Sequence, residues 1–252
     1  MNEILQVAMF AGQMILENGG ETYRVEETIW RICKIYGADE AESFATPTGI
    51  MASICHQGKT YSLTRRVSNR TVNLDKIDKV NDLSRSIQSN ILSVSDCKRE
   101  LEKINNLNTY SFLIVILFSG LAAGSFSILF GGNFKDAFSA FLIGLVIKGL
   151  ALKWSDVGIN TFFINSICAG ITALLAIIFF KLGISSQINQ TIIGSIMLLV
   201  PGLAITNAIR DTMSGDLLSG IIRASEAFLV AISIAVGTGA VLSFWISNLG
   251  GL

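Results

Sequence analysis

Charged side chains are scarce in this chain. Asp, Glu, Lys and Arg make up 15% of its 252 residues, against about 25% in an average soluble protein, while 51% of the residues are hydrophobic. The mean hydropathy is +0.57. A wholly soluble globular protein is therefore excluded, and we predict a membrane protein. The formal net charge of zero also gives no reason to expect nucleic acid as a partner.

Histidine is almost missing, and the cysteines are not grouped. His56 is the single histidine. The four cysteines lie far apart and form no CxxC pair: Cys33, Cys55, Cys97 and Cys168. A zinc site or a disulfide framework would need a closer grouping, so we predict reduced, buried thiols, no metal and no cofactor.

A secretion signal is missing as well. The first 18 residues begin with Glu3 rather than with a basic segment, and Gln6, Gln13 and Glu17 interrupt their apolar positions. We expect no cleavable signal and an N-terminus that stays in the cytoplasm.

The charges that are present concentrate in the first part of the chain. Of 19 Lys and Arg residues 13 precede residue 111, and of 19 Asp and Glu residues 14 do so. We therefore predict a cytoplasmic domain over residues 1–108 and a membrane domain over residues 109–252.

Helical and strand periodicities alternate within residues 1–108. Apolar residues at helical spacing predict helices over 3–18, 22–36, 74–91 and 93–105. Alternating residues predict two strands, over 50–55 and 60–67, joined by the short turn at His56-Gln57-Gly58. Thr46-Pro47-Thr48-Gly49 has the composition of a rigid turn. The domain is therefore predicted to be α+β.

This domain offers few groups for catalysis. Cys55 and His56 are neighbours in a strand, so their side chains point to opposite faces and do not readily form a nucleophile and base. No third group that would orient the histidine is recognisable in the sequence. Arg65 and Arg66 could contact lipid head groups or an acidic partner, although charges on a strand usually form a solvated face.

Five later segments are long and apolar enough to cross a bilayer, which takes about 20 residues. They cover roughly residues 110–130, 136–152, 161–180, 188–208 and 217–245. The predicted fold class is an α-helical polytopic membrane protein with five transmembrane helices and an N-terminal α+β cytoplasmic domain. A cytoplasmic N-terminus gives the cytoplasmic side Lys148, Lys153, Arg210 and Arg223, and the outside Lys135 and Lys181, in accord with the positive-inside rule. The C-terminus then falls outside.

The fourth span contains a predicted helix break beside charged residues. Pro201 removes a backbone donor and Gly202 loosens the same turn, which would expose carbonyl oxygens to a substrate. A set of residues then recurs at helical spacing and forms one stripe: Asp216, Ser219, Gly220, Arg223 and Glu226. Burying one such charge in a membrane costs about 2.5 to 3.5 kcal/mol, so the stripe should face a cavity or another helix.

Structural explanations for the same residues remain open. The proline could simply kink the helix. Arg223 could form a salt bridge with Glu226 or Asp216, or Asp216 could cap a helix at the cytoplasmic surface. A transport path is the alternative that the combination of a break and charges favours.

Several short motifs, in their order, resemble the threonine/serine exporter family. They are Gly19-Gly20-Glu21-Thr22-x-Arg24-Val25-Glu26, then Thr46-Pro47-Thr48-Gly49-Ile50, Thr64-Arg65-Arg66-Val67, and Pro201-Gly202 followed by Asn207, Arg210-Asp211, Gly215-Asp216, Gly220 and Arg223. The resemblance covers nearly the whole chain. It is specifically to the short YjjP-like subunit, which corresponds to the N-terminal half of a full-length exporter.

The resemblance implies a carrier in the cytoplasmic membrane that exports a small polar metabolite, with threonine or serine as the first expectation. It also implies a separate small, multi-span membrane subunit that supplies the second half. We expect the substrate to contact Pro201, Gly202, Asn207, Arg210, Asp211, Asp216 and Arg223. Arg223 would bind a carboxylate, Asp211 or Asp216 an ammonium group, and Glu226 would carry a proton if it lies deep in the span.

Three other functions compete with amino-acid export. Succinate would require two cationic sites, so that both Arg210 and Arg223 would line the path. The chain could instead be a membrane-tethered hydrolase, or a regulatory subunit that gates a partner. Five spans with charges inside the membrane are more than an anchor needs, and no enzyme activity is therefore expected.

Overall fold

The computed structural model describes residues 1–90, 92–107 and 110–249. The chain divides into two compact units, and each is described by itself below. The first unit contains Met1–Asn108 together with Gly202–Glu226, and the second contains Thr109–Pro201 together with Ala227–Leu252. The expected domain boundary at residues 108 and 109, the end of the predicted helix at Ile91 and the C-terminus lie outside the described residues.

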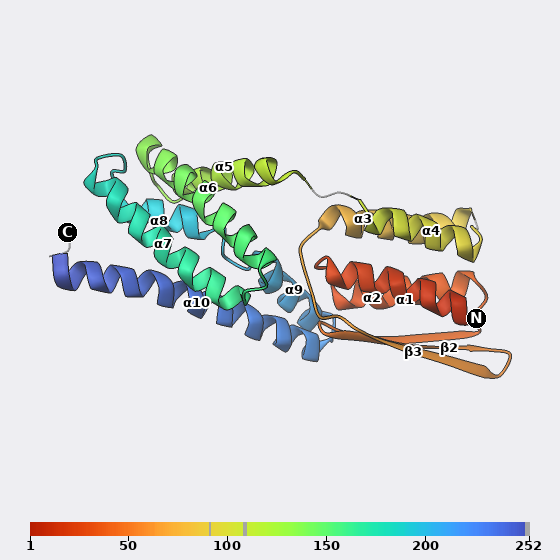
Figure 1. Cartoon of the computed structure of the whole chain (residues 1–252). Coiled ribbons are helices and arrows are strands. Elements are labelled where there is room, and N and C mark those ends of the chain that lie inside the picture. The colour runs from red at the N-terminus through yellow and green to blue at the C-terminus, as the bar shows by residue number, and fades with distance from the viewer. Residues whose placement is uncertain (91, 108–109, 250–252) are drawn as a thin grey trace. The chain divides into compact units, whose positions relative to one another are not determined.

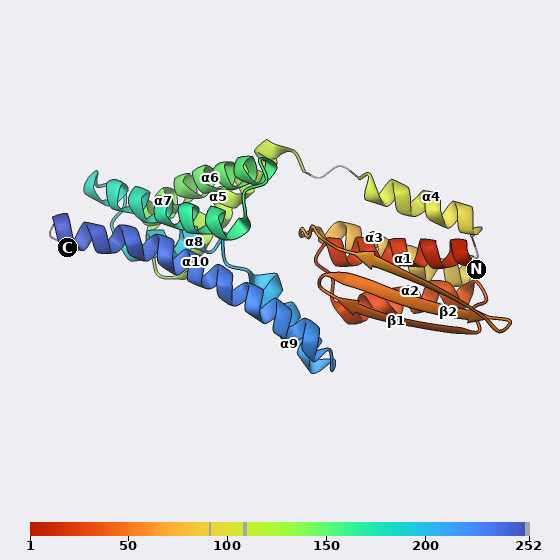
Figure 2. The same ribbon diagram turned by 60° about the horizontal axis from the view of Figure 1, so that its bottom comes forward.

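The first unit begins with an α+β fold in three layers. Helices α1 (Asn2–Glu17) and α2 (Thr22–Ile35) form the middle layer. Helices α3 (Leu74–Ser89) and α4 (Val94–Asn105) cover one side, and a sheet of β1 (Glu40–Thr46), β2 (Gly49–His56) and β3 (Lys59–Arg66) covers the other (Figures 1 and 2). The four helices and the two strands expected from periodicity are thus present, with ends shifted by one or two residues.

Helix α1 is the centre of this fold. It contacts α2, α3, α4, β2 and β3, which explains why ten of its residues are buried. An amphipathic helix ordinarily exposes its polar face to solvent, but here two layers cover α1 from opposite sides. Burial on both sides therefore fixes α1 more firmly than its own sequence pattern indicates.

The sheet has one strand more than the sequence predicted. The order is β1-β2-β3, both pairs are antiparallel, and Thr46-Pro47-Thr48-Gly49 makes the turn between β1 and β2. The second hairpin turns at Gln57 and Gly58, whose φ values of 51° and 73° suit a two-residue turn. The prediction missed β1 because its sequence, Glu-Ala-Glu-Ser-Phe-Ala-Thr, is an exposed edge strand with no strong apolar alternation.

Residues 202–226 add a helical hairpin to the same unit. Helix α9 (Gly202–Met213) turns at Ser214-Gly215-Asp216 into the first part of α10 (Leu217–Leu249). A side chain at Gly220 would meet the hydroxyl oxygen of Thr212 at 2.1 Å and the carbonyl oxygen of Ala208 at 3.0 Å. The glycine therefore lets α9 and α10 pack closely. We call residues 202–226 the arm.

The second unit is a helical bundle. It consists of α5 (Phe112–Leu129), α6 (Phe134–Asp156), α7 (Thr161–Lys181), α8 (Ile188–Ile196) and the part of α10 from Ala227 (Figure 1). Within the described residues, α5, α6, α7 and α10 are the four helices long and apolar enough to cross a membrane. Many of their apolar side chains face outward, as lipid contact requires: Leu113, Phe118, Leu129 and Phe228 are all at least 60% exposed.

The predicted fourth span over residues 188–208 is not one helix. Helix α8 ends at Ile196, a turn covers residues 197–200, and α9 begins at Gly202. Pro201 therefore separates two helices rather than bending one, because it cannot donate the backbone hydrogen bond that would continue α8. The predicted break is present, but a continuous fifth transmembrane helix is not.

Close helix contacts hold the bundle together. A side chain at Gly124 would meet the Ala137 carbonyl oxygen at 2.9 Å, and one at Gly194 would meet the backbone nitrogen of Ser127 at 2.7 Å. The Gly120-x-x-x-Gly124 pattern thus packs α5 on α6, as small residues do in membrane helices. Asp136, fully buried, accepts hydrogen bonds from the backbone of Ser186 and Gln187 at 2.7 and 2.8 Å and so fixes the segment that leads into α8.

The cysteines differ in accessibility, which gives a first testable prediction. Cys33, Cys97 and Cys168 are buried, whereas Cys55 is half-buried on β2. Burial raises the pKa of the Cys33 thiol to about 12, so the reactive thiolate is also rare there. We expect a maleimide to modify only Cys55 in the native protein, as measured by mass spectrometry, and all four thiols after denaturation.

Cys55→Ser should then remove native labelling, which is the control. Modification of Cys33 at the rate seen for Cys55 would contradict the packing of α2.

Candidate functional site

The turn between α1 and α2 is built for close approach. Gly19 has a φ of +93°, a conformation that favours glycine, and it ends α1. A side chain at Gly20 would lie 2.3 Å from the Ile15 side chain. The Gly19-Gly20 pair therefore makes a tight turn that leaves two carbonyl oxygens open to the arm.

The arm binds both of these carbonyl oxygens. Asn207 Nδ2 donates to the Gly19 oxygen at 2.9 Å, and Arg223 Nη2 donates to the Gly20 oxygen at 2.7 Å. Both arm residues are at most 5% exposed. Two sequence motifs almost 200 residues apart thus form one hydrogen-bonded site.

Two carboxylates of the arm face the N-terminus of α2. The Thr22 backbone N–H donates to Asp211 Oδ1 at 3.3 Å, and the Thr22 hydroxyl donates to Asp216 Oδ2 at 3.2 Å. The N-terminal N–H groups of a helix lack partners within the helix and carry a partial positive charge, so nearby carboxylates stabilise it. Asp211 and Asp216 thus cap a helix of the α+β fold from the arm.

A buried ion pair lies at the centre of the site. Arg223 Nε is 2.9 Å from Asp211 Oδ2, and the two side chains are 6% and 0% exposed. These two atoms make no aligned hydrogen bond within the described part of the chain, so the pairing is carried by charge and proximity. Removing either partner would leave an uncompensated buried charge.

Further ion pairs surround this centre. Glu21 pairs with Arg210 of the arm and with Arg24 of its own helix, the latter at 2.8 Å. Arg70, before α3, forms two hydrogen bonds with Glu226 of α10. These outer pairs are more exposed than the central one, so water screens them and each contributes less.

The environment shifts the pKa of several acids outside the spans. Burial raises the pKa of Asp211, and the Arg223 guanidinium opposes this rise. Burial also raises the pKa of Glu26. The negative charges of Asp216 and Asp211 add to this rise, and the hydrogen bond from the Ala45 N–H opposes it. Burial alone would raise the pKa of Glu21, but hydrogen bonds from Arg24 and other donors outweigh burial, so the pKa is lowered. The site therefore concentrates negative charge that the arginines neutralise.

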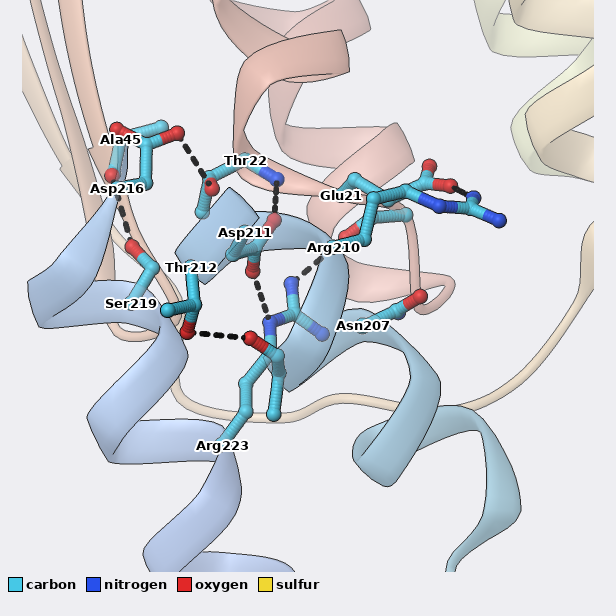
Figure 3. Close-up of polar contacts among 12 residues, drawn as sticks. Glu21, Thr22, Ala45, Asn207, Arg210, Asp211, Thr212, Asp216, Ser219 and Arg223 are labelled. Carbon is cyan, nitrogen blue, oxygen red and sulfur yellow. Dashed lines mark hydrogen bonds and ion pairs between the residues drawn. The ribbon is translucent and has the colours of Figure 1, made fainter. Parts of the chain in front are cut away.

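The structure brings together most of the residues expected at a site, though not all. Asn207, Arg210, Asp211, Asp216 and Arg223 converge on the α1–α2 turn (Figure 3). Pro201 and Gly202 lie at the helix break instead. The predicted stripe is buried in part: Ser219 and Arg223 are buried, whereas the Glu226 side chain is 36% exposed.

The partners within the site differ from the expected ones. Arg223 pairs with Asp211 rather than with Glu226 or Asp216. Glu226 pairs with Arg70, and its side chain is 36% exposed. Its role as a proton carrier stays a prediction.

Several residues of the site were not identified as site residues from the sequence. Glu21 and Thr22 belong to the N-terminal motif that carried the family resemblance, and that motif was the available signal. Glu26 accepts the Ala45 N–H at 2.8 Å, and Ser219 donates to the Ala45 oxygen at 3.4 Å, which ties β1 to the arm. Arg70 had no distinguishing pattern.

An open polar cavity adjoins the ion pairs. Its volume is about 580 Å³. Its lining includes acidic side chains, arginines and an amide: Glu21, Asp75, Asp78, Arg24, Arg210 and Asn207. Such a lining can bind a small molecule that carries both charges, because each end finds an opposite partner.

The residues considered for catalysis do not form a dyad. In β2 the core-facing positions are Ile50, Ala52 and Ile54, so Cys55 lies on the opposite face from His56. His56 Nδ1 is 3.7 Å from Asp39 Oδ2, near the hairpin tip. This distance is too long for a hydrogen bond that would orient the imidazole, and Cys55 is on the wrong face to act as its nucleophile.

These features define a class of protein: a multi-pass membrane protein in which a charged helical arm is bound to an α+β domain. The family described as "Putative threonine/serine exporter" matches residues 6–245. The chain belongs to this family.

The chain is similar both to relatives of about its own length and to longer relatives. A protein of Klebsiella aerogenes named "Probable succinate transporter subunit YjjP" is 24% identical over 234 residues, 92% of this chain and 90% of the relative. The protein of the same name from Escherichia coli K12 is 24% identical over 96% of this chain and 94% of its own length. The "Threonine/serine exporter" of Corynebacterium glutamicum is 25% identical over 69% of this chain but only 36% of its own length. No solved structure matches.

Proposed function

We propose that this chain is one subunit of a secondary transporter that exports threonine or serine across the cytoplasmic membrane. Membership in the exporter family supports export as the function. The observation that carries the proposal is the broken helix at Pro201, which leads directly into a charged arm. Transporters commonly place broken helices and buried charges along the substrate path. The chain would act as a carrier and not as an enzyme.

The chain would cross the membrane five times, with its N-terminus in the cytoplasm. Helices α5, α6, α7 and α10 give four crossings. Helix α8 has nine residues and is about 14 Å long at 1.5 Å per residue, about half of the 30 Å hydrocarbon core. The turn at 197–201 and the apolar start of α9 would complete the fifth crossing.

A second, small membrane subunit would supply the other half of the transporter. The two relatives of nearly the same length carry the word "subunit" in their names. This chain covers about a third of the longer Corynebacterium exporter, which leaves room for a second half there. A second half that starts outside would run inverted, as in many secondary transporters.

The site favours a zwitterionic amino acid as substrate. Asn207 and Arg210 line the polar cavity together with Asp75 and Asp78, so a carboxylate and an ammonium group would both find partners. Asp211 and Arg223 would contribute once their ion pair opens, and Asp216 once it is released from Thr22. Succinate is the second candidate, because the two whole-length relatives are named for it, and it would need Arg210 and Arg223 together.

The arm would couple the α+β domain to transport. It folds with this domain through the Thr22 N–H bond to Asp211 and the bonds to the Gly19-Gly20 carbonyl oxygens, and it joins the membrane unit at Pro201 and at Ala227 in sequence. A movement of the arm would therefore act on the helix break and on α10. Glu226, released from Arg70, would be the group that exchanges a proton.

Efflux from preloaded cells tests this proposal. Cells are loaded with labelled threonine or, separately, labelled succinate, and express the chain alone or with the second subunit. We expect threonine efflux only when both proteins are present, because each would supply half of the path.

Succinate efflux without threonine efflux would assign the transporter to dicarboxylates. Absence of both, with both proteins found in the membrane, would contradict export and favour a regulatory role. Activity of the chain toward ester or peptide substrates that is lost in Cys55→Ser would favour the hydrolase alternative.

A further inference from the structure

A pocket lies at the helix break inside the membrane unit. Its volume is about 270 Å³, slightly below the roughly 300 Å³ where typical ligand pockets begin, which suits a small metabolite. Residues of α6, α7, α10 and the break line it, among them Lys148, Thr161, Asn165, Leu198 and Pro201. All of them belong to the second unit.

The backbone at this pocket has free acceptors. Within the described residues of the membrane unit, no N–H group donates to the carbonyl oxygens of residues 197–200. Pro201 has no N–H to offer, so it cannot continue the hydrogen bonding of α8 to these oxygens. Unpaired carbonyl groups at membrane depth are tolerated where they line a cavity, and Leu198 and Leu199 are among the residues that line this pocket.

Two polar side chains in the pocket also have no partner among the described residues. Asn165 is 8% exposed and makes no side-chain hydrogen bond there. Lys148 pairs with no carboxylate within ion-pair distance in that same part of the chain. An ionisable group in a membrane unit is by default a candidate functional group, and both side chains are available to bind a ligand.

Anchoring at the membrane surface does not explain Lys148. It lies eight residues before the end of α6, about 12 Å along the helix, whereas Lys153 in the last turn already occupies the usual position of an anchoring lysine. Lys148 instead shares its pocket with groups that complement a charged ligand.

We propose that this pocket binds the amino-acid substrate, with Lys148 and Asn165 holding the carboxylate and the free carbonyl oxygens of the break holding the ammonium group. One cation beside several acceptors fits a zwitterion, while a second carboxylate would meet the carbonyl oxygens and be repelled. The topology given above places this end of α6 and the start of α7 on the cytoplasmic side, where an exporter loads its substrate. The assignment rests on the proposed function and adds a site to it.

Substrate protection of a cysteine in the pocket tests the assignment without measuring transport. Ala151, which lines the pocket, is changed to cysteine in a chain carrying Cys55→Ser. The rate of its modification by a thiol reagent is then measured in membranes that contain the chain and the second subunit, with and without threonine. We expect threonine to slow modification, and Lys148→Met to weaken this protection at least tenfold.

Two matched variants and one competing ligand complete the experiment. Lys153→Met, on the same helix but outside the pocket, should leave protection unchanged, and Lys148→Arg should keep part of it because the positive charge remains. Succinate should protect less than threonine. Failure of threonine to protect, or equal protection in Lys148→Met, would overturn the assignment, and equal protection by succinate would overturn its preference for a zwitterion.

Efflux measured on the same variants separates the two proposals. Protection that depends on Lys148 in a protein that exports nothing would leave the pocket standing and reject export. If the wild type exports threonine and Lys148→Met exports it equally well, export would stand and the substrate pocket would be rejected.

Discussion

Arg223→Met or Asp211→Asn should each destabilise the protein by about 3 to 5 kcal/mol, because either change leaves one buried charge without its partner. The remaining group is shielded from water, since the side chains of Asp211 and Arg223 are 0% and 6% exposed. Thermal unfolding of the purified protein in detergent, with the α+β domain followed by circular dichroism, measures the loss.

The double variant decides what the pair is for. Asn at 211 keeps an acceptor for the Thr22 N–H, and Met at 223 fills a similar volume, so removing both charges should restore most of the stability. If the pair also takes part in transport, threonine efflux should remain lost in this stable protein. Wild-type efflux by the double variant would show that Asp211 and Arg223 serve the fold alone.

Gly237→Ala should be the most damaging small substitution in the membrane unit. A side chain at this position of α10 would lie 1.9 Å from the Ser166 carbonyl oxygen, which belongs to the backbone of α7 and cannot rotate away. The two helices would have to separate, at a cost of about 1 to 3 kcal/mol or more. The same unfolding experiment and the yield of folded protein in membranes measure this effect.

Gly239→Ala is the matched control, two residues further along the same helix. Among the residues that the structure describes, none has an atom within 4 Å of a side chain built there. Alanine favours a helix by up to about 1 kcal/mol over glycine, so this variant should be neutral or slightly stabilised. Equal destabilisation by both substitutions would contradict the packing of α7 against α10.

The helix break was predictable because its cause is local. Proline cannot donate a backbone hydrogen bond in any context, so Pro201 interrupts the hydrogen bonding of the helix at that position wherever the segment is placed. The same holds for the inward stripe on α10, since three- and four-residue spacing puts Ser219 and Arg223 on one face. The capping of α4 by Ser93, which accepts the Asp96 N–H at 3.1 Å, is local as well.

Ion pairs and strand pairings between different segments of the chain were not predictable in this way. Periodicity shows which face of a helix is buried but not which segment covers it, so the salt bridges considered for Arg223 were only those with the nearby Glu226 and Asp216. Its partner Asp211 lies across the Ser214-Gly215-Asp216 turn, and the Glu226 partner Arg70 lies 156 positions away. The edge strand β1 was missed for a related reason, because pairing with β2 rather than its own composition makes it a strand.

The sequence by itself determined that this is a membrane protein with a charge-rich first part, an interrupted fourth apolar segment and the motifs of an exporter family. Composition, proline chemistry and helical spacing decide these properties, and all three are local. Only the tertiary structure decided that the arm folds with the α+β domain and that Lys148 and Asn165 share a pocket with the free carbonyl oxygens of the break. Those are contacts between distant segments, which chain packing selects and which no pattern within a single segment specifies.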